Sequence, residues 1–125
     1  MCYSEAVNLP EDAIVINGIV MVAFDDYVTD VLMRDLVGHD RRPVSFLVYL
    51  WLAAEQHRRK TMVLISYQEL AECVGVSKSS AQAAVSWLVR RKLLAVNKES
   101  VTATPRYTVL SPWRNVAHRS AGRLR

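Results

Sequence analysis

Apolar residues fill the segment from residue 13 to residue 24, and only Asn17 and Gly18 interrupt them. These two residues tolerate a positive φ and separate two β-branched stretches, so the pattern predicts a tight β-hairpin. Neither stretch alternates with polar residues, as a strand with one solvent-facing side would. We therefore expect both faces of the hairpin to be buried.

Two helical patterns follow the hairpin. Acidic residues open the segment 25–37, its apolar residues recur at helical spacing, and Gly38 suits its end. Pro43 opens the second pattern, because the missing N–H of proline costs nothing in a first turn, and the cations of residues 57–60 favour its C-terminus. The apolar positions that define these two helices are Val28, Leu32 and Leu36, then Phe46, Leu47, Leu50, Trp51 and Ala54.

Shorter elements occupy the middle of the chain. Residues 62–65 form a brief apolar run that is typical of a strand. Ser66 and Glu69 have the spacing of a capping box, in which each side chain accepts a hydrogen bond from the backbone of the other residue. This pair predicts a short helix from Tyr67 to about Val74.

A tight turn and a longer helix come next. Gly75 permits a left-handed turn, and Ser77 can cap a helix that we expect from about residue 78 to residue 92. One apolar stripe of this helix is expected to face the core. Its members are Ala81, Val85 and Leu88, with Val89 at the edge. The segments 93–97 and 106–110 then favour two strands, separated by a loop rich in Ser and Thr.

Charge divides the chain unevenly. Residues 1–40 carry one base and eight acids, a net charge of −7, and residues 41–125 carry fifteen bases and four acids, a net charge of +11. From Cys73 onward ten bases face a single acid, Glu99. A basic region of this kind attracts polyanions such as nucleic acids. A solvated basic surface explains the charge equally well. The charge alone therefore does not distinguish a nucleic-acid-binding protein from one with a basic surface, and the sequence motifs are needed as well.

Several classes of protein do not fit this composition. The longest uncharged stretches, residues 13–24 and 43–54, have twelve residues each, whereas a membrane-spanning helix needs about 20. No Lys or Arg occurs in residues 1–33, so we expect no signal peptide. Two cysteines are too few for a disulfide scaffold. We therefore expect an intracellular protein without a membrane partner.

The chain shows no pattern of a catalytic or metal-binding site. His39, His57 and His118 lack the spacing of metal ligands. We find no nucleophile–base pair, no phosphate-binding glycine loop and no carboxylate cluster. We therefore expect no enzymatic activity, no metal and no cofactor, and we do not expect a small-molecule effector.

Residues 70–94 read LAECVGVSKSSAQAAVSWLVRRKLL. They resemble the winged helix-turn-helix of GntR-like regulators and of plasmid and phage replication initiators, whose approximate pattern is L-A-x-x-x-G-V-S-[RK]-x-[TS]-V-x-x-x-[LVI]-x-x-L-x-x-x-G-L-[IL]. The preceding helix and the strand near Arg106 extend the resemblance over residues 43–110. Two residues depart from the pattern: Ala81 replaces Val, and Lys92 replaces Gly. The resemblance implies an α+β, mainly helical winged helix-turn-helix fold that binds double-stranded DNA.

The resemblance also implies where DNA is bound. The helix 78–92 would enter the major groove, and the wing, residues 94–110, would follow the backbone or the minor groove. Gln82 can pair with adenine, and Lys78 can reach a guanine or a phosphate. The candidates lie on the outward face of this helix, at the starts of both helices, at the end of the second helix and on the wing. They are Tyr67, Gln68, Ser77, Lys78, Ser79, Ser80, Gln82, Ala83, Ser86, Arg90, Arg91, Lys98, Thr102, Thr104 and Arg106.

These patterns divide the chain into three parts. Residues 1–40 form an acidic N-terminal extension, residues 41–110 the winged helix-turn-helix, and residues 111–125 a basic C-terminal tail. A winged helix does not need the apolar hairpin and the helix that follows it. The segment 13–37 therefore either joins two copies, as binding to paired half-sites requires, or covers the winged helix of its own chain. We favour the homodimer.

Three functions remain open. We expect a sequence-specific transcription regulator, in the first place a repressor, in the cytoplasm and associated with the nucleoid. The alternatives are a replication-initiator-like or architectural DNA-binding protein, and a winged helix that binds other proteins. The fifteen bases of residues 41–125 argue against the last.

Overall fold

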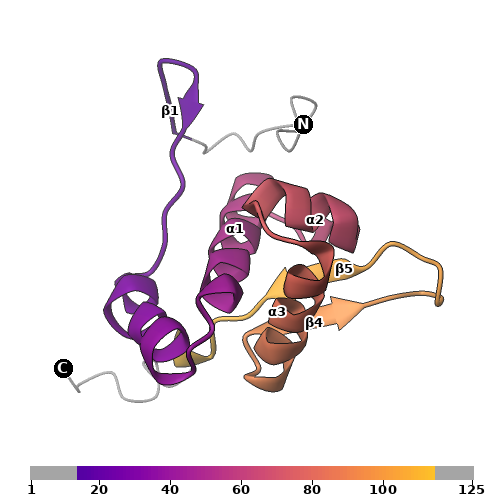
Figure 1. The fold of residues 1–125 in the computed structure, drawn as a ribbon. Coiled ribbons are helices and arrows are strands. Elements are labelled where there is room, and N and C mark those ends of the chain that lie inside the picture. Colours follow the sequence, from indigo (N-terminus) through magenta and orange to yellow (C-terminus); the bar gives the residue numbers. More distant parts are fainter. Residues whose placement is uncertain (1–13, 115–125) are drawn as a thin grey trace.

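A computed structural model describes residues 14–114 of the chain. Helix α1 (Pro43–Arg59) lies at the centre, and α2 (Tyr67–Val74) and α3 (Lys78–Arg90) pack against it (Figure 1). The three predicted helices of this region are confirmed, and α2 has the predicted bounds. The predicted helix 78–92 is two residues shorter, because the chain turns at residues 91 and 92.

A three-stranded antiparallel sheet completes the core. β3 (Val63–Leu64) pairs with β5 (Arg106–Val109), and β5 also pairs with β4 (Leu94–Asn97), so the strand order is β3-β5-β4. Tyr107 in the middle strand lies opposite a residue of each neighbour and is completely buried. The predicted strands are therefore confirmed, and the described part of the chain is a small α+β domain.

The buried face of helix α1 matches the predicted apolar positions only in part. Phe46 is buried as its spacing indicates, and so are Val48, Tyr49 and Leu52, whereas Leu47 is 46% exposed. Trp51 is half-buried. Apolar residues occur on nearly every side of this helix, so their spacing alone does not single out the buried face.

The predicted helix 25–37 is present, but it is wider than an α-helix. It consists of two π-helical segments, η1 (Val28–Leu32) and η2 (Arg34–His39), in which hydrogen bonds reach five residues back. Its predicted apolar positions are at most 3% exposed and belong to the main core. Gly38, expected at the end, lies inside η2. The chain leaves this helix at Asp40 and reaches α1 through Arg41, whose φ is +57°.

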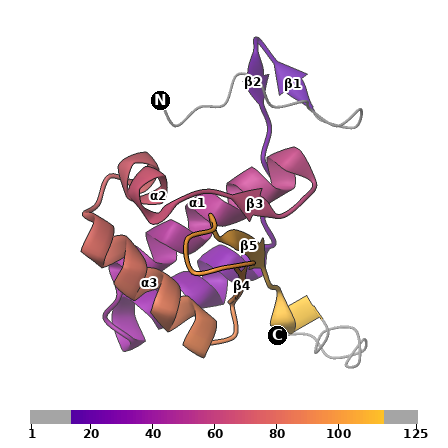
Figure 2. The same cartoon turned by 90° about the vertical axis from the view of Figure 1, so that its right-hand side faces the viewer.

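The N-terminal hairpin is confirmed, but its burial is not. β1 (Val15–Ile16) and β2 (Ile19–Val20) pair in register, and Asn17 and Gly18 have φ values of +53° and +78°, as a tight turn requires. The hairpin stands away from the helices (Figures 1 and 2). The expectation that both its faces are buried is wrong for a single chain, because an extended connection holds these two short strands away from the body. The exposed side chains are Ile14, Val15, Ile16, Ile19, Met21 and Phe24.

The first residues of the predicted tail are fixed to the extension. The Trp113 ring stacks on Tyr27 at 4.6 Å, and its indole N–H donates to Asp25 at 2.8 Å. Arg114 donates two further hydrogen bonds to Asp25, at 2.6 and 2.7 Å. These bonds from Arg114 hold the pKa of the Asp25 carboxyl below its usual value, against the opposing effect of burial. Residues 1–13 and 115–125, with the remaining bases of the tail, lie outside the described residues.

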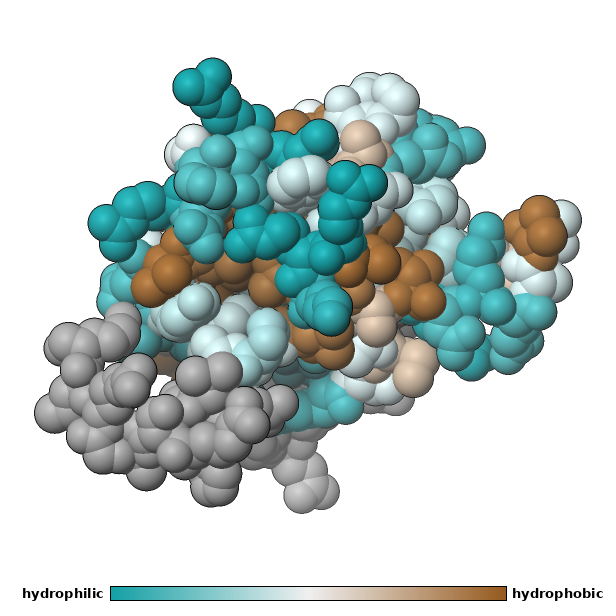
Figure 3. All heavy atoms as spheres, turned by 90° about the horizontal axis from the view of Figure 1, so that it is seen from below, coloured by the Kyte–Doolittle hydropathy of each residue, from teal (hydrophilic) through white to brown (hydrophobic). Residues whose placement is uncertain are grey.

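The described surface is of mixed character. Seen from below, apolar residues form a band across the middle of the molecule, bordered by hydrophilic residues (Figure 3). Among residues 14–114, no helix is both long enough and apolar enough to cross a membrane.

Candidate nucleic-acid interface

Hydrogen bonds fix the corner between α2 and α3. Ser66 accepts from the backbone N–H of Glu69 at 3.1 Å, and the Glu69 carboxylate accepts from the backbone of Ser66 at 3.5 Å, which confirms the capping box. Gly75 ends α2 with a φ of +91°, a conformation that glycine adopts without strain. Ser77 then caps α3 by accepting from the backbone N–H of Ser80 at 3.1 Å. The direction in which α3 leaves this corner is therefore defined locally.

Helix α3 has one buried face and one exposed face. Ala81, Ala84, Val85 and Leu88 are at most 2% exposed. Val89, expected at the edge of the buried stripe, is 42% exposed, and Ala84 takes its place in the core. The helix contains no acidic residue. The residues expected on its outward face are all exposed: Lys78, Ser79, Gln82, Ala83 and Ser86.

Three serine hydroxyls gather at the start of α3. The hydroxyl oxygen of Ser77 lies 3.2 Å from that of Ser79 and 2.9 Å from that of Ser80. The first turn of a helix also leaves backbone N–H groups without intrahelical partners and carries the positive end of the helix dipole. With the exposed Lys78 beside them, these donors favour an anion at this end of α3.

The candidates at the start of α2 are less free to contact a ligand. Tyr67 is half-buried, and its ring meets Tyr107 edge-on at 6.3 Å. Burial raises the pKa of the Tyr107 phenol well above its usual value of 10. Gln68 is exposed, but its side-chain amide donates to the Glu72 carboxylate at 3.2 Å. The structure thus assigns Tyr67 a packing role and places a negative charge next to Gln68.

The loop between β4 and β5 extends away from the helices (Figure 1). Lys98, Thr102 and Thr104 on this loop are exposed. Arg106 at its far end is 3.2 Å from Glu99, and both side chains are open to solvent. Exposed ion pairs of this kind are weak, so Arg106 remains able to exchange Glu99 for another anion.

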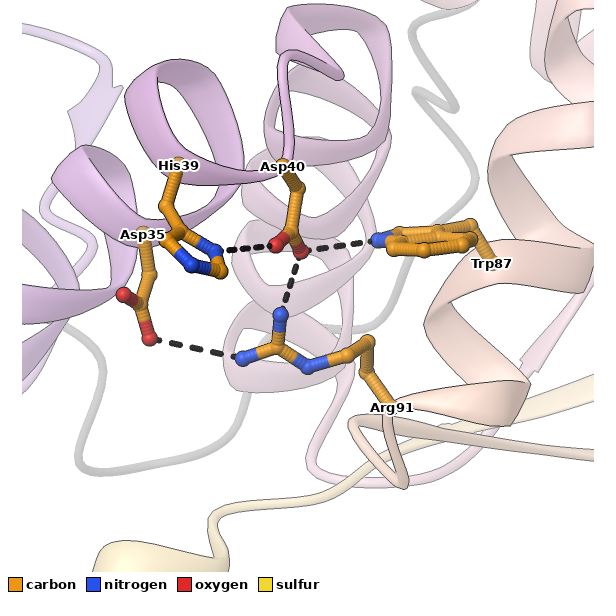
Figure 4. Close-up of polar contacts among 5 residues, drawn as sticks. All are labelled: Asp35, His39, Asp40, Trp87 and Arg91. Atoms are coloured by element: carbon orange, nitrogen blue, oxygen red, sulfur yellow. Dashed lines mark hydrogen bonds and ion pairs between the residues drawn. The ribbon is translucent and has the colours of Figure 1, made fainter.

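The basic residues at the end of α3 have different surroundings. Arg90 and Lys92 are exposed. The φ of Lys92 is +61°, a left-handed conformation that glycine adopts with less strain than lysine. Arg91 instead turns toward η2, where it forms ion pairs with Asp40 and, at 3.3 Å, with Asp35 (Figure 4). Arg91 is therefore occupied by ion pairs within its own chain and lies apart from the other predicted DNA-binding residues.

Asp40 is the centre of this ion-pair network. Its side chain is 4% exposed and accepts hydrogen bonds from Trp87 at 2.9 Å, from His39 at 3.0 Å and from Arg91 (Figure 4). Burial by itself would raise the pKa of the Asp40 carboxyl, but the hydrogen bonds from His39 and Trp87 and the charge of Arg91 outweigh it and lower the pKa below 3.8. The network joins the extension to α3.

The structure brings Arg42, which is not among the DNA-binding candidates predicted from the sequence, to this end of α3. Its guanidinium lies 4.2 Å from the centre of the Trp87 ring, and that of Arg90 lies 5.6 Å from the same ring. Within residues 14–114 neither arginine forms an ion pair. Arg42 precedes Trp87 by 45 residues, so no local signal could have joined them. Arg42 and Arg90, both held on Trp87, are a pair of available cations beside α3.

A hollow of about 450 Å³ opens between the base of the hairpin, α1 and β5. Several of the polar groups that line it already bind the protein itself, although the buried Nδ1 of His57 has no hydrogen-bond partner among the described residues. Both ends of the Gln56 amide bind the backbone of Val109, and the Tyr49 hydroxyl donates to the Leu110 carbonyl. In the part of the chain that the structure describes, no group of three His, Cys, Asp or Glu side chains could hold a metal ion. The exposed polar face of α3 therefore remains the strongest candidate site.

Comparison with known proteins assigns no family to this chain. No family model matches it, and neither a curated protein nor a solved structure matches it at a significant level.

Proposed function

We propose that residues 41–110 are a winged helix-turn-helix and that this chain is a sequence-specific, double-stranded DNA-binding regulator of transcription. The order of elements supports the fold: α1, β3, α2, α3 and then the β4–β5 hairpin, with β5 between the other two strands. In a helix-turn-helix the second helix of the pair reads the major groove. That helix is α3.

The exposed face of α3 carries the proposal. It presents amide, hydroxyl and ammonium groups, contains no carboxylate, and lies opposite a fully buried face. Groups of these kinds hydrogen-bond to base edges and phosphates, and a carboxylate among them would repel the phosphates.

The contacts divide between reading bases and positioning the backbone. Gln82 lies in the middle of the exposed face and reads a base edge, because a glutamine can make two hydrogen bonds to adenine. Lys78 and the serine hydroxyls at the start of α3 bind phosphate. The wing, through Lys98 and Arg106, follows the backbone or the minor groove.

Regulation follows from occupancy of the DNA site. A protein that occupies a promoter excludes other proteins from it, so repression is the expected effect. Crosslinking in host cells followed by sequencing of the bound DNA distinguishes this role from that of a replication initiator. Occupancy of promoters supports the regulator, and occupancy of one origin region alone contradicts it.

Selection from a pool of random duplexes tests sequence-specific binding directly. The full chain should enrich one short motif over successive rounds. Arg34→Ala, a substitution in the acidic extension, serves as a matched control and should enrich the same motif. A chain that retains no duplex, or that enriches no motif, would contradict the proposal.

A further inference from the structure

The N-terminal hairpin with its connection, residues 14–24, is a projecting apolar arm. Six of its large side chains are exposed, from 39% for Phe24 to 67% for Ile19. Monomeric proteins rarely expose contiguous apolar patches of this kind unless the patch binds something. The strands of the arm stand apart from the helices in both views (Figures 1 and 2), so the described body of the chain does not cover them, whereas Phe24 at the base of the arm borders the hollow beside α1.

The arm is also incomplete as a β-sheet. Within the described part of the chain it has two strands of two residues each, and no third strand joins either outer edge. An isolated two-stranded hairpin is at best marginally stable in water, and unpaired strand edges readily pair with another strand. The arm therefore needs a partner that supplies both strand edges and apolar side chains.

We propose that this partner is the arm of a second copy of the same chain. Residues 14–24 carry no charged side chain, so two arms meet without the repulsion that two basic bodies would feel, and a charged partner would find no complementary charge. The same apolar patch on both copies suits a two-fold interface. The six side chains leave on the order of 500 Å² open per chain, spread over both faces of the hairpin, so a contact that covers both faces of each arm reaches about 1,000 Å², the lower limit for a specific interface.

The helix of the extension, η1 and η2, does not take part in the proposed dimer contact. Val28, Leu32 and Leu36 are buried in the core of their own chain. The extended connection, residues 21–25, separates that core from the strands. The dimer contact is therefore confined to the arm, and the two bodies stay independent of it.

Light scattering after size-exclusion chromatography of the full chain tests the proposal. At tens of micromolar the wild type should have twice the 14.1 kDa mass of one chain. Ile19→Asp places a charge in the contact and should raise the dissociation constant of the dimer on the order of 100-fold, to give monomers. Ile14→Asp, one residue before β1, keeps the backbone carbonyl that accepts from the N–H of Met21 at 2.7 Å, so it should have the same effect without altering the hairpin register. Val101→Asp, at a side chain that is 91% exposed on the wing, is the matched control and should stay dimeric.

A monomeric wild type would overturn the proposal. A dimer that survives both Ile19→Asp and Ile14→Asp would overturn it as well. Unchanged thermal unfolding of the helical body in both variants shows that the loss of mass arises from the arm. The measurement contains no DNA, so its failure is distinguishable from a failure of DNA binding.

Discussion

Trp87 lies between two sets of arginines with different surroundings: Arg91, which pairs with a carboxylate, and Arg42 and Arg90, which lie over the Trp87 ring. Its indole N–H and Arg91 both donate to Asp40, so the charge of Arg91 is balanced within the protein. Its ring carries Arg42 and Arg90, which have no carboxylate partner among the described residues. A guanidinium stacked on an indole loses less side-chain freedom when it binds a phosphate than one that moves freely in solvent. In the DNA complex that we propose, Arg42 and Arg90 are therefore the cations best placed to bind the backbone.

Arg42→Ala tests this assignment. Because phosphates carry no sequence information, the substitution should weaken binding to specific and random duplexes alike, by about three- to tenfold, and lower the slope of log K against log salt by about one unit. Fluorescence anisotropy with labelled duplexes measures both effects. Arg34→Ala is the control, since Arg34 bonds the backbone of Asp30 in the acidic extension, and it should leave the slope unchanged. Equal slopes for Arg42→Ala and the wild type would exclude a phosphate contact.

Gln82→Ala, unlike Arg42→Ala, should weaken binding to the specific site more than binding to random duplexes. It removes a contact to a base edge, so it should cost about 1–3 kcal/mol on the selected site and relax the preference at one base pair. Competition with duplexes substituted at single positions measures the preference. Arg90→Ala is the matched control and should weaken all duplexes nearly equally. If Gln82→Ala weakened every sequence equally, α3 would not read bases through this residue, and Lys98 and Arg106 of the wing would become the first candidates.

At the scale of elements, η2 and α3 are held together by the buried carboxylate of Asp40. The residues that meet there are 47 to 51 positions apart in the chain. The network fixes the C-terminal end of α3, just as the Ser77 cap fixes its N-terminal end. The acidic extension therefore helps to orient the helix that we assign to DNA reading.

Asp40→Asn should lower the free energy of unfolding by about 1.5–3 kcal/mol at pH 7, because the hydrogen bonds to Asp40 lose their charge. The pKa of Asp40 is lowered in the folded protein, so its stabilising effect is complete above the ordinary value of 3.8 and is lost as the pH falls through the lower folded pKa. Urea unfolding should thus show a larger difference between variant and wild type at pH 7 than at pH 3. Asp30→Asn, at an exposed position, should change stability by less than about 0.5 kcal/mol. A pH-independent effect would show that the charge of Asp40 is not what joins the elements.

Local signals predicted most of these elements. The Ser66–Glu69 box, Gly75, Ser77 and the Asn17-Gly18 turn act over a few residues, and the structure has each of them where the sequence indicates. The buried faces were predicted less well. Leu47 and Val89 are as apolar as their buried neighbours, and only the arrangement of the other elements decides which of them faces the core.

The candidate site was predictable only where it is continuous in sequence. The exposed residues of α3 follow from its helical period. The involvement of Arg42, the diversion of Arg91 to Asp40 and the exposure of the arm depend on contacts between distant segments, or on their absence within the described chain. The one hint in the sequence was the unusual concentration of acids in residues 1–40 beside a basic remainder.

At the scale of the whole molecule, the net charge of +4 results from two unlike parts. Some acids of the extension already form ion pairs within the protein. Asp25 pairs with Arg114, while Asp35 and Asp40 both pair with Arg91. Lys78, Arg90, Lys92 and Lys98 have no ion-pair partner within residues 14–114. These four residues lie on α3, at its end and on the wing, which is the surface that we assign to DNA, and Arg41 and Arg42 add two exposed cations just before α1.

The dependence of duplex binding on salt tests the central claim most directly. If one chain neutralises about 4–6 phosphates, log K should fall against log salt with a slope of about −4 to −5 per chain. Anisotropy titrations of the full chain on a selected duplex, from low to physiological salt, measure this slope. A steep, linear fall is the predicted result. Affinity that stays flat over the same range, or no binding at low salt, would contradict a DNA-binding function.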